Sequence, residues 1–221
     1  MQNFATTTAI ATILDIPAGT IRFIATDRAD TTVEVLPANA GKSRDVKAAE
    51  ETTVELQGGV LRISTPQKNE AFGASGSVSV TVQLPAGSSV EAKTASAEFT
   101  TTGRLGDVSL ESAHGTVKLD EAAGVRLALA AGDITVGRLT GSADIRTQKG
   151  DLTIAEATTG TVTLRTEHGD ITVGAARGVS ATLDAGTSYG RISNALQNAG
   201  GGDTLTIHAT TAAGDITART V

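Results

Sequence analysis

Residues 130–141 read AAGDITVGRLTG, and the phrase returns with small changes as QKGDLTIAEATTG at 148–160, EHGDITVGAARG at 167–178 and AAGDITARTV at 212–221. Each copy joins a glycine and an acidic or small residue, which favour a tight turn, to a run of alternating apolar and polar side chains. The sequence therefore repeats a unit that consists of a turn followed by a short strand.

The spacing of the copies gives the length of the repeat. The gaps between the opening glycines are 17, 18, 19, 21 and 24 residues, and these glycines are Gly115, Gly132, Gly150, Gly169, Gly190 and Gly214. A unit this short cannot bury an apolar face alone, but stacked units bury a continuous one. The repeat predicts stacked coils whose equivalent strands lie about 4.8 Å apart.

Each repeat holds two alternating runs, and alternation at period two is a strand signal. The apolar positions of the first run are Val117/Leu119, Ile134/Val136, Leu152/Ile154 and Ile171/Val173, and those of the second are Val108/Leu110, Ala143/Ile145, Val162/Leu164 and Ala181/Leu183. We expect these side chains to face inward and the residues between them to face outward.

These patterns predict an all-β fold, a single-domain parallel β-helix (β-solenoid) with two short strands per coil of about 17–21 residues. The expected domain covers residues 1–221, with irregular N-terminal coils over 1–95 and regular Gly-Asp coils over 96–221. Two polar stretches predict excursions from the coils, at 38–50 with room for a brief helical turn and at 66–76 as a loop.

Composition excludes several classes of protein. Hydrophobic residues make up 39% of the chain and aromatic residues only 2%, so the expected core is thin and aliphatic. The net charge is −6, with acidic and basic residues spread along the chain, which argues against a nucleic-acid partner. The chain contains no cysteine, which excludes disulfides and thiolate metal sites.

The N-terminal residues lack the basic start and unbroken apolar run of a secretory signal. No stretch approaches the roughly 20 apolar residues that cross a bilayer. We therefore expect a cytoplasmic protein without a membrane span. An exported form whose leader had been removed would give the same sequence pattern.

Three further stretches carry a family resemblance: DIPAGTIRFIATDRADTTVEVLPA at 15–38, LPAGSSVEAKTASAEFTTTGRLGDVSLES at 84–112, and TSYGRISNAL at 187–196. Together with the Gly-Asp coils, they resemble a bacterial β-strand-repeat family of unknown function whose domain is labelled "putative adhesin". The resemblance covers essentially the whole chain. It implies a parallel β-helix and assigns no catalytic residues.

A column of aspartates is the first candidate site. Asp133, Asp151 and Asp170 follow the opening glycine in three consecutive repeats, so stacking would place them roughly 5 Å apart. Such a column is a candidate cation ladder for Ca²⁺, which takes six to eight oxygen ligands. The structural alternative is that each carboxylate holds the backbone of its own turn, with Arg191 as a counter-charge in the next repeat.

The histidines do not predict a metal site. His114 and His168 lie three repeats apart, about 14 Å in a stacked coil, which is too far to share a zinc ion. His208 lies in a strand with no acidic residue beside it in the sequence. There is also no nucleophile elbow or phosphate-binding loop. We therefore predict no catalytic residue, cofactor or bound metal.

Arg146 and Arg165 form the candidate interaction face, because they occupy equivalent places in adjacent repeats. Glu111 and Asp184 fall in the same column of the repeat, which predicts a ladder of mixed charge. Exposed ladders of this kind are usually solvated faces with weak ion pairs.

The predicted function is that of a non-enzymatic scaffold or interaction protein, which presents a Thr- and charge-rich face to an unknown macromolecular partner, expected to be a protein. The alternatives are a polysaccharide-acting enzyme of β-helix type that uses the arginine face, and a cation-binding module that uses the aspartate column. The sequence ends in a strand-like run at Val221, so residues 215–219 are expected to be an open edge. Such an edge predicts either cover from the N-terminal region or a homo-oligomer.

Overall fold

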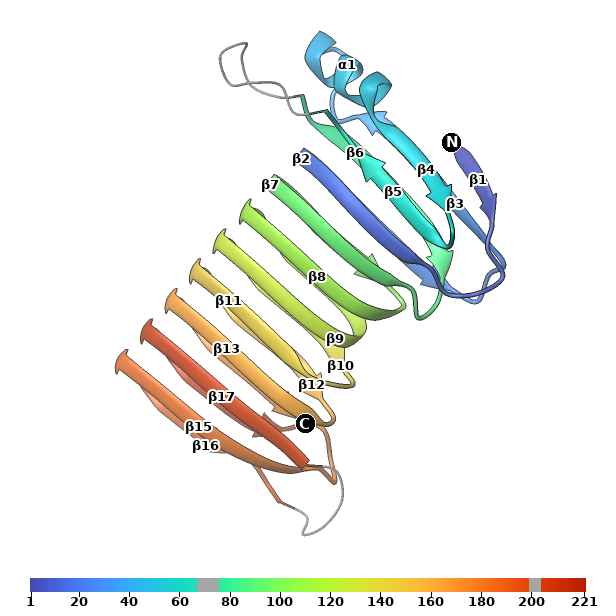
Figure 1. Cartoon of the computed structure of the whole chain (residues 1–221). Coiled ribbons are helices and arrows are strands. Elements are labelled where there is room, and N and C mark those ends of the chain that lie inside the picture. The colour runs from blue at the N-terminus through green and yellow to red at the C-terminus, as the bar shows by residue number, and fades with distance from the viewer. Residues whose placement is uncertain (67–75, 199–203) are drawn as a thin grey trace. The chain divides into compact units, whose positions relative to one another are not determined.

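The computed structural model describes residues 1–66, 76–198 and 204–221, which contain 18 strands and one helix. Figure 1 shows these elements along the chain. They fall into two compact units, unit 1 over Met1–Gly115 and unit 2 over Thr116–Val221. The protein is dominated by β-strands, as the alternation predicts, whereas the organisation as a single domain stays a prediction.

Unit 1 contains the helix and eight strands. They are β1 (Gln2–Ala5), β2 (Ala11–Thr26), β3 (Asp30–Pro37), α1 (Ser43–Glu51), β4 (Thr53–Gln57), β5 (Val60–Ser64), β6 (Val78–Pro85), β7 (Ser89–Thr102) and β8 (Arg104–His114). The long strand β2 pairs in parallel with β5 along its first part, with β6 along its later part and with β7 along both. Phe23 of β2 and Phe99 of β7 are buried, with ring centroids 5.6 Å apart.

The predicted parallel β-helix is wrong, because the strand pairing is mixed. Three pairs in unit 1 are antiparallel: β1 with β3, β3 with β6, and β4 with β5. Gly58 and Gly59 join β4 to β5 and have φ angles of 59° and 78°, as a two-residue hairpin turn requires. A hairpin returns the chain beside itself, whereas a parallel helix needs each strand to advance by one coil.

The helix α1 lies in the first predicted excursion and is longer than the expected brief turn, at nine residues. Asp45 of α1 is buried, and its carboxylate accepts a hydrogen bond of 3.0 Å from the backbone N–H of Ser77. That bond fixes the helix to the chain just before β6. Among the described residues, no helix has the length and apolar character needed to cross a membrane. The second predicted excursion, 66–76, lies outside the described residues except at its two ends.

Unit 2 contains ten strands: β9 (Val117–Ala131), β10 (Ile134–Leu139), β11 (Ala143–Lys149), β12 (Leu152–Ala157), β13 (Gly160–His168), β14 (Ile171–Ala175), β15 (Ser180–Tyr189), β16 (Ile192–Ala195), β17 (Thr204–Ala213) and β18 (Ile216–Thr220). The pairings between these strands are parallel. They form two ladders, in the order β9-β11-β13-β17-β15 and β9-β10-β12-β14-β18-β16.

The coil of β17 and β18, which comes last in the sequence, does not lie at the end of the stack of coils in unit 2. β17 pairs with β13 on one side and β15 on the other, and β18 likewise lies between β14 and β16. Figure 1 shows β17, in red, between β13 and β15. The coil of residues 204–220 is therefore inserted between two coils that precede it in the sequence.

This insertion moves the open edge of unit 2. Residues 216–219 belong to β18, which is paired on both sides, so the expectation of an open edge at 215–219 is wrong. In the described part of unit 2, β15 and β16 are the strands at this end, and Tyr189 of β15 and Ile192 of β16 are 81% and 48% exposed. Self-association of the protein stays a prediction.

The predicted inward side chains form an aliphatic core in each unit. Of the positions expected to face inward, all are buried except Leu183, which is half-buried in β15 at the end of its ladder. The core is aliphatic because the sequence supplies few aromatic residues. The outward positions between them are left for polar side chains, which carry the candidate site.

Candidate interaction surface

Arg146 and Arg165 lie side by side on the outer face of unit 2. They are in register on the neighbouring parallel strands β11 and β13, so their Cα atoms are about 4.8 Å apart. Both side chains are exposed, and neither guanidinium forms an ion pair with a carboxylate of the described residues. The two like charges therefore repel each other across the strands without a counter-charge from this part of the chain.

The mixed-charge ladder predicted around this pair does not form. The next residue in register beyond Arg165 is Thr210 of the inserted strand β17, and beyond Arg146 it is Ala128 of β9. Asp184 lies on β15, two strands beyond Arg165, and two residues before Gly186, which is the β15 residue in the row of the arginines. Glu111 lies in unit 1, in register with Lys93.

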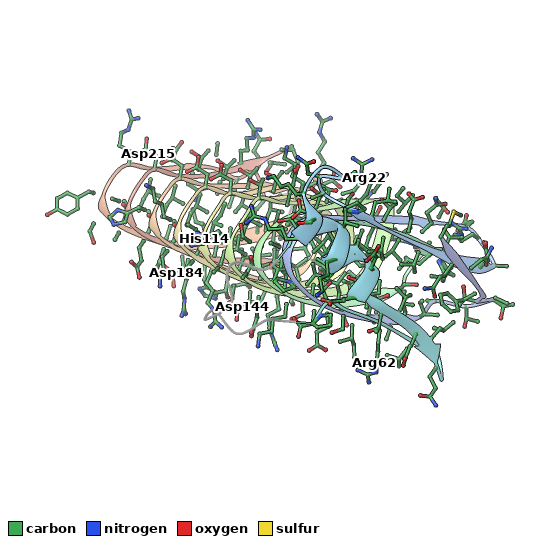
Figure 2. All side chains as sticks on the ribbon, turned by 90° about the horizontal axis from the view of Figure 1, so that it is seen from above. Arg22, Arg62, His114, Asp144, Asp184 and Asp215 are labelled. Atoms are coloured by element: carbon green, nitrogen blue, oxygen red, sulfur yellow. The ribbon has the colours of Figure 1, made fainter. Side chains whose placement is uncertain are left out.

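The neighbouring row of the same face contains charges of both signs. It runs Arg126, Asp144, Thr163, His208 and Asp184 across five successive strands. Figure 2 shows Asp144 and Asp184 on one side of unit 2 and Asp215 on the other. Each carboxylate of the row thus has a basic residue in register beside it.

The environment predicted for His208 is wrong. Its ring Nδ1 lies 3.3 Å from a carboxylate oxygen of Asp184, on the adjacent strand. The local sequence does not show this neighbour, because Asp184 precedes His208 by 24 residues and becomes adjacent only through the pairing of β15 with β17. The pair is exposed, with 45% of the histidine side chain and 83% of the aspartate side chain accessible to solvent.

The aspartate column exists and joins one coil to the next. Oδ1 of Asp133 accepts the backbone N–H of Asp151 at 2.9 Å, and Oδ1 of Asp151 accepts that of Asp170 at 2.8 Å. The column continues to Asp215, whose N–H is donated to Asp170 at 2.7 Å. Each carboxylate therefore holds the following turn in space and not its own turn, which differs from the structural alternative drawn from the sequence.

Arg191 closes this column, but next to Asp215 and not next to Asp170. It donates its backbone N–H to Oδ1 of Asp215 at 2.9 Å and its guanidinium to Oδ2 at 2.7 Å. These bonds hold the pKa of the Asp215 carboxyl below its ordinary value of 3.8, and they raise the pKa of Arg191. Arg191 therefore supplies the counter-charge predicted from the sequence, but it pairs with Asp215 and not with Asp170.

The Asp215 pair predicts a dependence of stability on acid. Because its pKa is lowered in the folded protein, the stabilisation is present above 3.8 and is lost as the pH falls through the folded-state pKa. We expect Asp215→Asn to lower the urea midpoint at about pH 7, and the difference from the unchanged protein to shrink near pH 3. Asp144→Asn, at a carboxylate without an ion pair among the described residues, is the control. A difference that stayed constant with pH would contradict the assignment.

A row of threonines supports the same corner from inside, and sequence reasoning missed it. Thr166 and Thr211 are buried and donate their hydroxyls to the carbonyls of Gly150 and Gly169, each at 3.1 Å. Thr187 donates in the same way to Gly214 at 3.0 Å. A threonine three residues before each of the later opening glycines was the available signal, and it extends the repeated phrase to Thr-x-x-Gly.

The Asp151 carboxylate offers a direct test of the corner. We expect Asp151→Ala to lower the free energy of unfolding by about 1 kcal/mol, because the N–H of Asp170 loses its acceptor. Asp151→Asn keeps an acceptor oxygen and should lose less than half of that. Urea unfolding monitored by circular dichroism measures both variants. Equal losses would show that the hydrogen bond is not what the carboxylate contributes.

The described residues contain no group of three or more histidine, aspartate or glutamate side chains arranged to hold a metal ion. In the aspartate column the Oδ1 atoms already accept backbone hydrogen bonds. The cation ladder of Asp133, Asp151 and Asp170 stays a prediction, which a calcium titration followed by calorimetry would test.

The chain is similar to several solved structures at low sequence identity. A putative adhesin from Bacteroides fragilis is 13% identical, with a TM-score of 0.58 and coverage of 98% of this chain and 95% of that chain. A putative cell adhesion protein from Clostridium sporogenes is 9% identical, with a TM-score of 0.47 and coverage of 100% and 98%. A putative lipid binding protein from Parabacteroides distasonis is 11% identical, with a TM-score of 0.40 and coverage of 98% and 95%.

No curated protein matches the chain. The model of one family matches residues 13–221, almost the whole length. This match confirms the family resemblance read from the sequence. The Bacteroides fragilis structure carries the same description, putative adhesin, as the family named in the resemblance. The parallel β-helix that the resemblance implied is not confirmed. The chain belongs to the Toastrack DUF4097 family.

Proposed function

We propose that this member of the Toastrack family is a non-enzymatic interaction protein. Its unit 2 presents the outer face of β11, β13, β17 and β15 to a protein partner. The observation that carries the proposal is the exposed pair Arg146 and Arg165, which lie in register without an ion-pair partner among the described residues. A partner that supplied negative charge would relieve their repulsion. The description of the Bacteroides fragilis structure as a putative adhesin supports a role in binding.

The enzymatic alternative has less support. A polysaccharide-acting enzyme needs acidic groups placed around the scissile bond, and no carboxylate of the described residues is in register with Arg146 or Arg165. Turnover of uronate polymers that was lost in Arg165→Ala would favour the enzyme. The cytoplasmic location stays a prediction.

Affinity capture from the native cell tests the proposal. The test variant is Arg146→Glu/Arg165→Glu, and the matched control is Lys118→Glu/Arg219→Glu, at exposed positions on β9 and β18. Each double change moves the net charge by −4, from −6 to −10, so non-specific charge effects are equal. We expect the arginine-face variant to lose at least about tenfold of a protein that the other two recover. Equal recovery by all three would contradict the proposal.

A further inference from the structure

The geometry points to a carboxylate-binding clamp formed by Arg146, Arg165 and Thr210, which takes an acidic segment of a protein partner. The inference rests on the proposed function and names the chemistry of the partner at the same face. The three residues occupy one row on three successive strands, β11, β13 and β17. All three side chains are exposed.

The spacing of the row suits carboxylates. Two arginines whose Cα atoms lie about 4.8 Å apart along the ladder can each donate to the oxygens of one carboxylate or of two neighbouring ones. The hydroxyl of Thr210 stands next in the row as a further donor. An arginine fork matches the planar carboxylate and binds it through two parallel hydrogen bonds.

The surroundings limit the ligand to a short acidic group. In the adjacent row Asp144 lies in register with Arg126, and Asp184 lies against His208, so that row adds no excess positive charge. Glu167 lies two residues beyond Arg165 on β13 and adds negative charge at that side. A long polyanion, such as nucleic acid or a sulfated polysaccharide, needs a continuous basic track. Because the neighbouring residues include carboxylates and leave no continuous basic track, the pair favours one or two side-chain carboxylates of a peptide.

The insertion of the last coil completes this clamp. If β15 followed β13 directly, the residue beside Arg165 would come from β15, where Gly186 occupies this row and has no side chain to donate a hydrogen bond. The inserted strand β17 places Thr210 there instead. The clamp thus depends on the spatial order of the coils and is not visible in the order of the sequence.

Titration of the full chain with a tetraglutamate peptide tests the inference. The readouts are the chemical shifts of the arginine Nε–H groups in the unchanged protein and of the backbone amides of β11 and β13 in every variant. We expect saturable shifts that weaken at least about tenfold in Arg146→Gln/Arg165→Gln and as the salt concentration rises. Lys118→Gln/Arg219→Gln should bind the peptide like the unchanged protein. Thr210→Val, which keeps the shape of the side chain, should weaken binding by about threefold.

The outcomes separate this inference from the proposed function. If the arginine-face variant lost its captured protein but tetraglutamate did not shift the arginine signals, the carboxylate inference would be overturned and the interaction face would stand. If a heparin or polyuronate oligosaccharide bound the two arginines more tightly than tetraglutamate, the acidic-peptide partner would be wrong. Peptide binding that survived in Arg146→Gln/Arg165→Gln would also overturn the clamp.

Discussion

Gly150→Ala is expected to lower the free energy of unfolding by more than about 4 kcal/mol, and to leave unit 2 largely unfolded. Gly150 has φ of +142°, which side chains rarely adopt. A Cβ atom at this position would lie 2.2 Å from the carbonyl oxygen of Gly132, a backbone atom of the coil below. The stacked corner leaves this oxygen no room to retreat, so the coils would have to separate.

Gly178→Ala is the matched control for this change. Gly178 also has a positive φ, +83°, but an added Cβ atom would meet nothing within 4 Å. Its cost should be only the backbone term of about 1–2 kcal/mol. Chemical denaturation of both variants measures the difference. Similar losses would mean that the close stacking of the corner contributes nothing beyond backbone strain.

Removal of residues 204–221 is expected to have an equally large effect, above about 5 kcal/mol. This truncation takes out β17 and β18, which are the strands that β15 and β16 pair with. It also removes Leu205, Ile207 and Ile216, which are at most 1% exposed. Thermal unfolding should become broad and occur at a much lower temperature, as measured by circular dichroism.

A deletion of residues 178–203 provides the comparison. It removes β15 and β16 but leaves β17 paired with β13 and β18 paired with β14. We expect this chain to remain folded, because the inserted coil then follows β14 directly in both sequence and space. A truncation at 203 that proved more stable than the internal deletion would contradict the insertion.

The side chains that face inward from each repeated strand were predictable from the sequence. Alternation identifies the inward side chains because a strand turns every second residue to the same face, and Ile134, Leu152 and Ile171 are all buried as that rule requires. The corner was predictable in part, because the recurring Gly-Asp pair marks the turn. Its hydrogen bonds were not, since a carboxylate can reach the next coil as easily as its own turn.

The antiparallel hairpin of β4 and β5 in unit 1 has a signal in the sequence. Gly58-Gly59 stands between two short alternating runs, which is a typical hairpin sequence. The pairing of β3 with β6 had none, because the partners are separated along the chain and either direction buries the same apolar side chains. The predicted fold class was therefore wrong because unit 1 contains antiparallel pairs, which the repeat does not indicate.

The order of the coils could not be read from the repeat. The coils of residues 180–195 and 204–220 each have a glycine at the corner, Gly190 and Gly214, and the same alternation of apolar and polar residues. Either coil could therefore stack on β13 and β14. This ambiguity hid the place of Thr210 beside Arg165. The two arginines themselves were found because β11 and β13 follow each other in both sequence and space.

Disulfide crosslinking tests this spatial order most directly, because the chain has no cysteine of its own. Thr206 lies in register with Thr161 of β13 on one side and Thr182 of β15 on the other. We expect Thr161→Cys/Thr206→Cys and Thr182→Cys/Thr206→Cys to crosslink under mild oxidation, since adjacent strands bring Cα atoms within disulfide range. Thr161→Cys/Thr182→Cys, two strands apart, should not. Rapid crosslinking of this last pair, without that of Thr161→Cys/Thr206→Cys, would contradict the inserted coil.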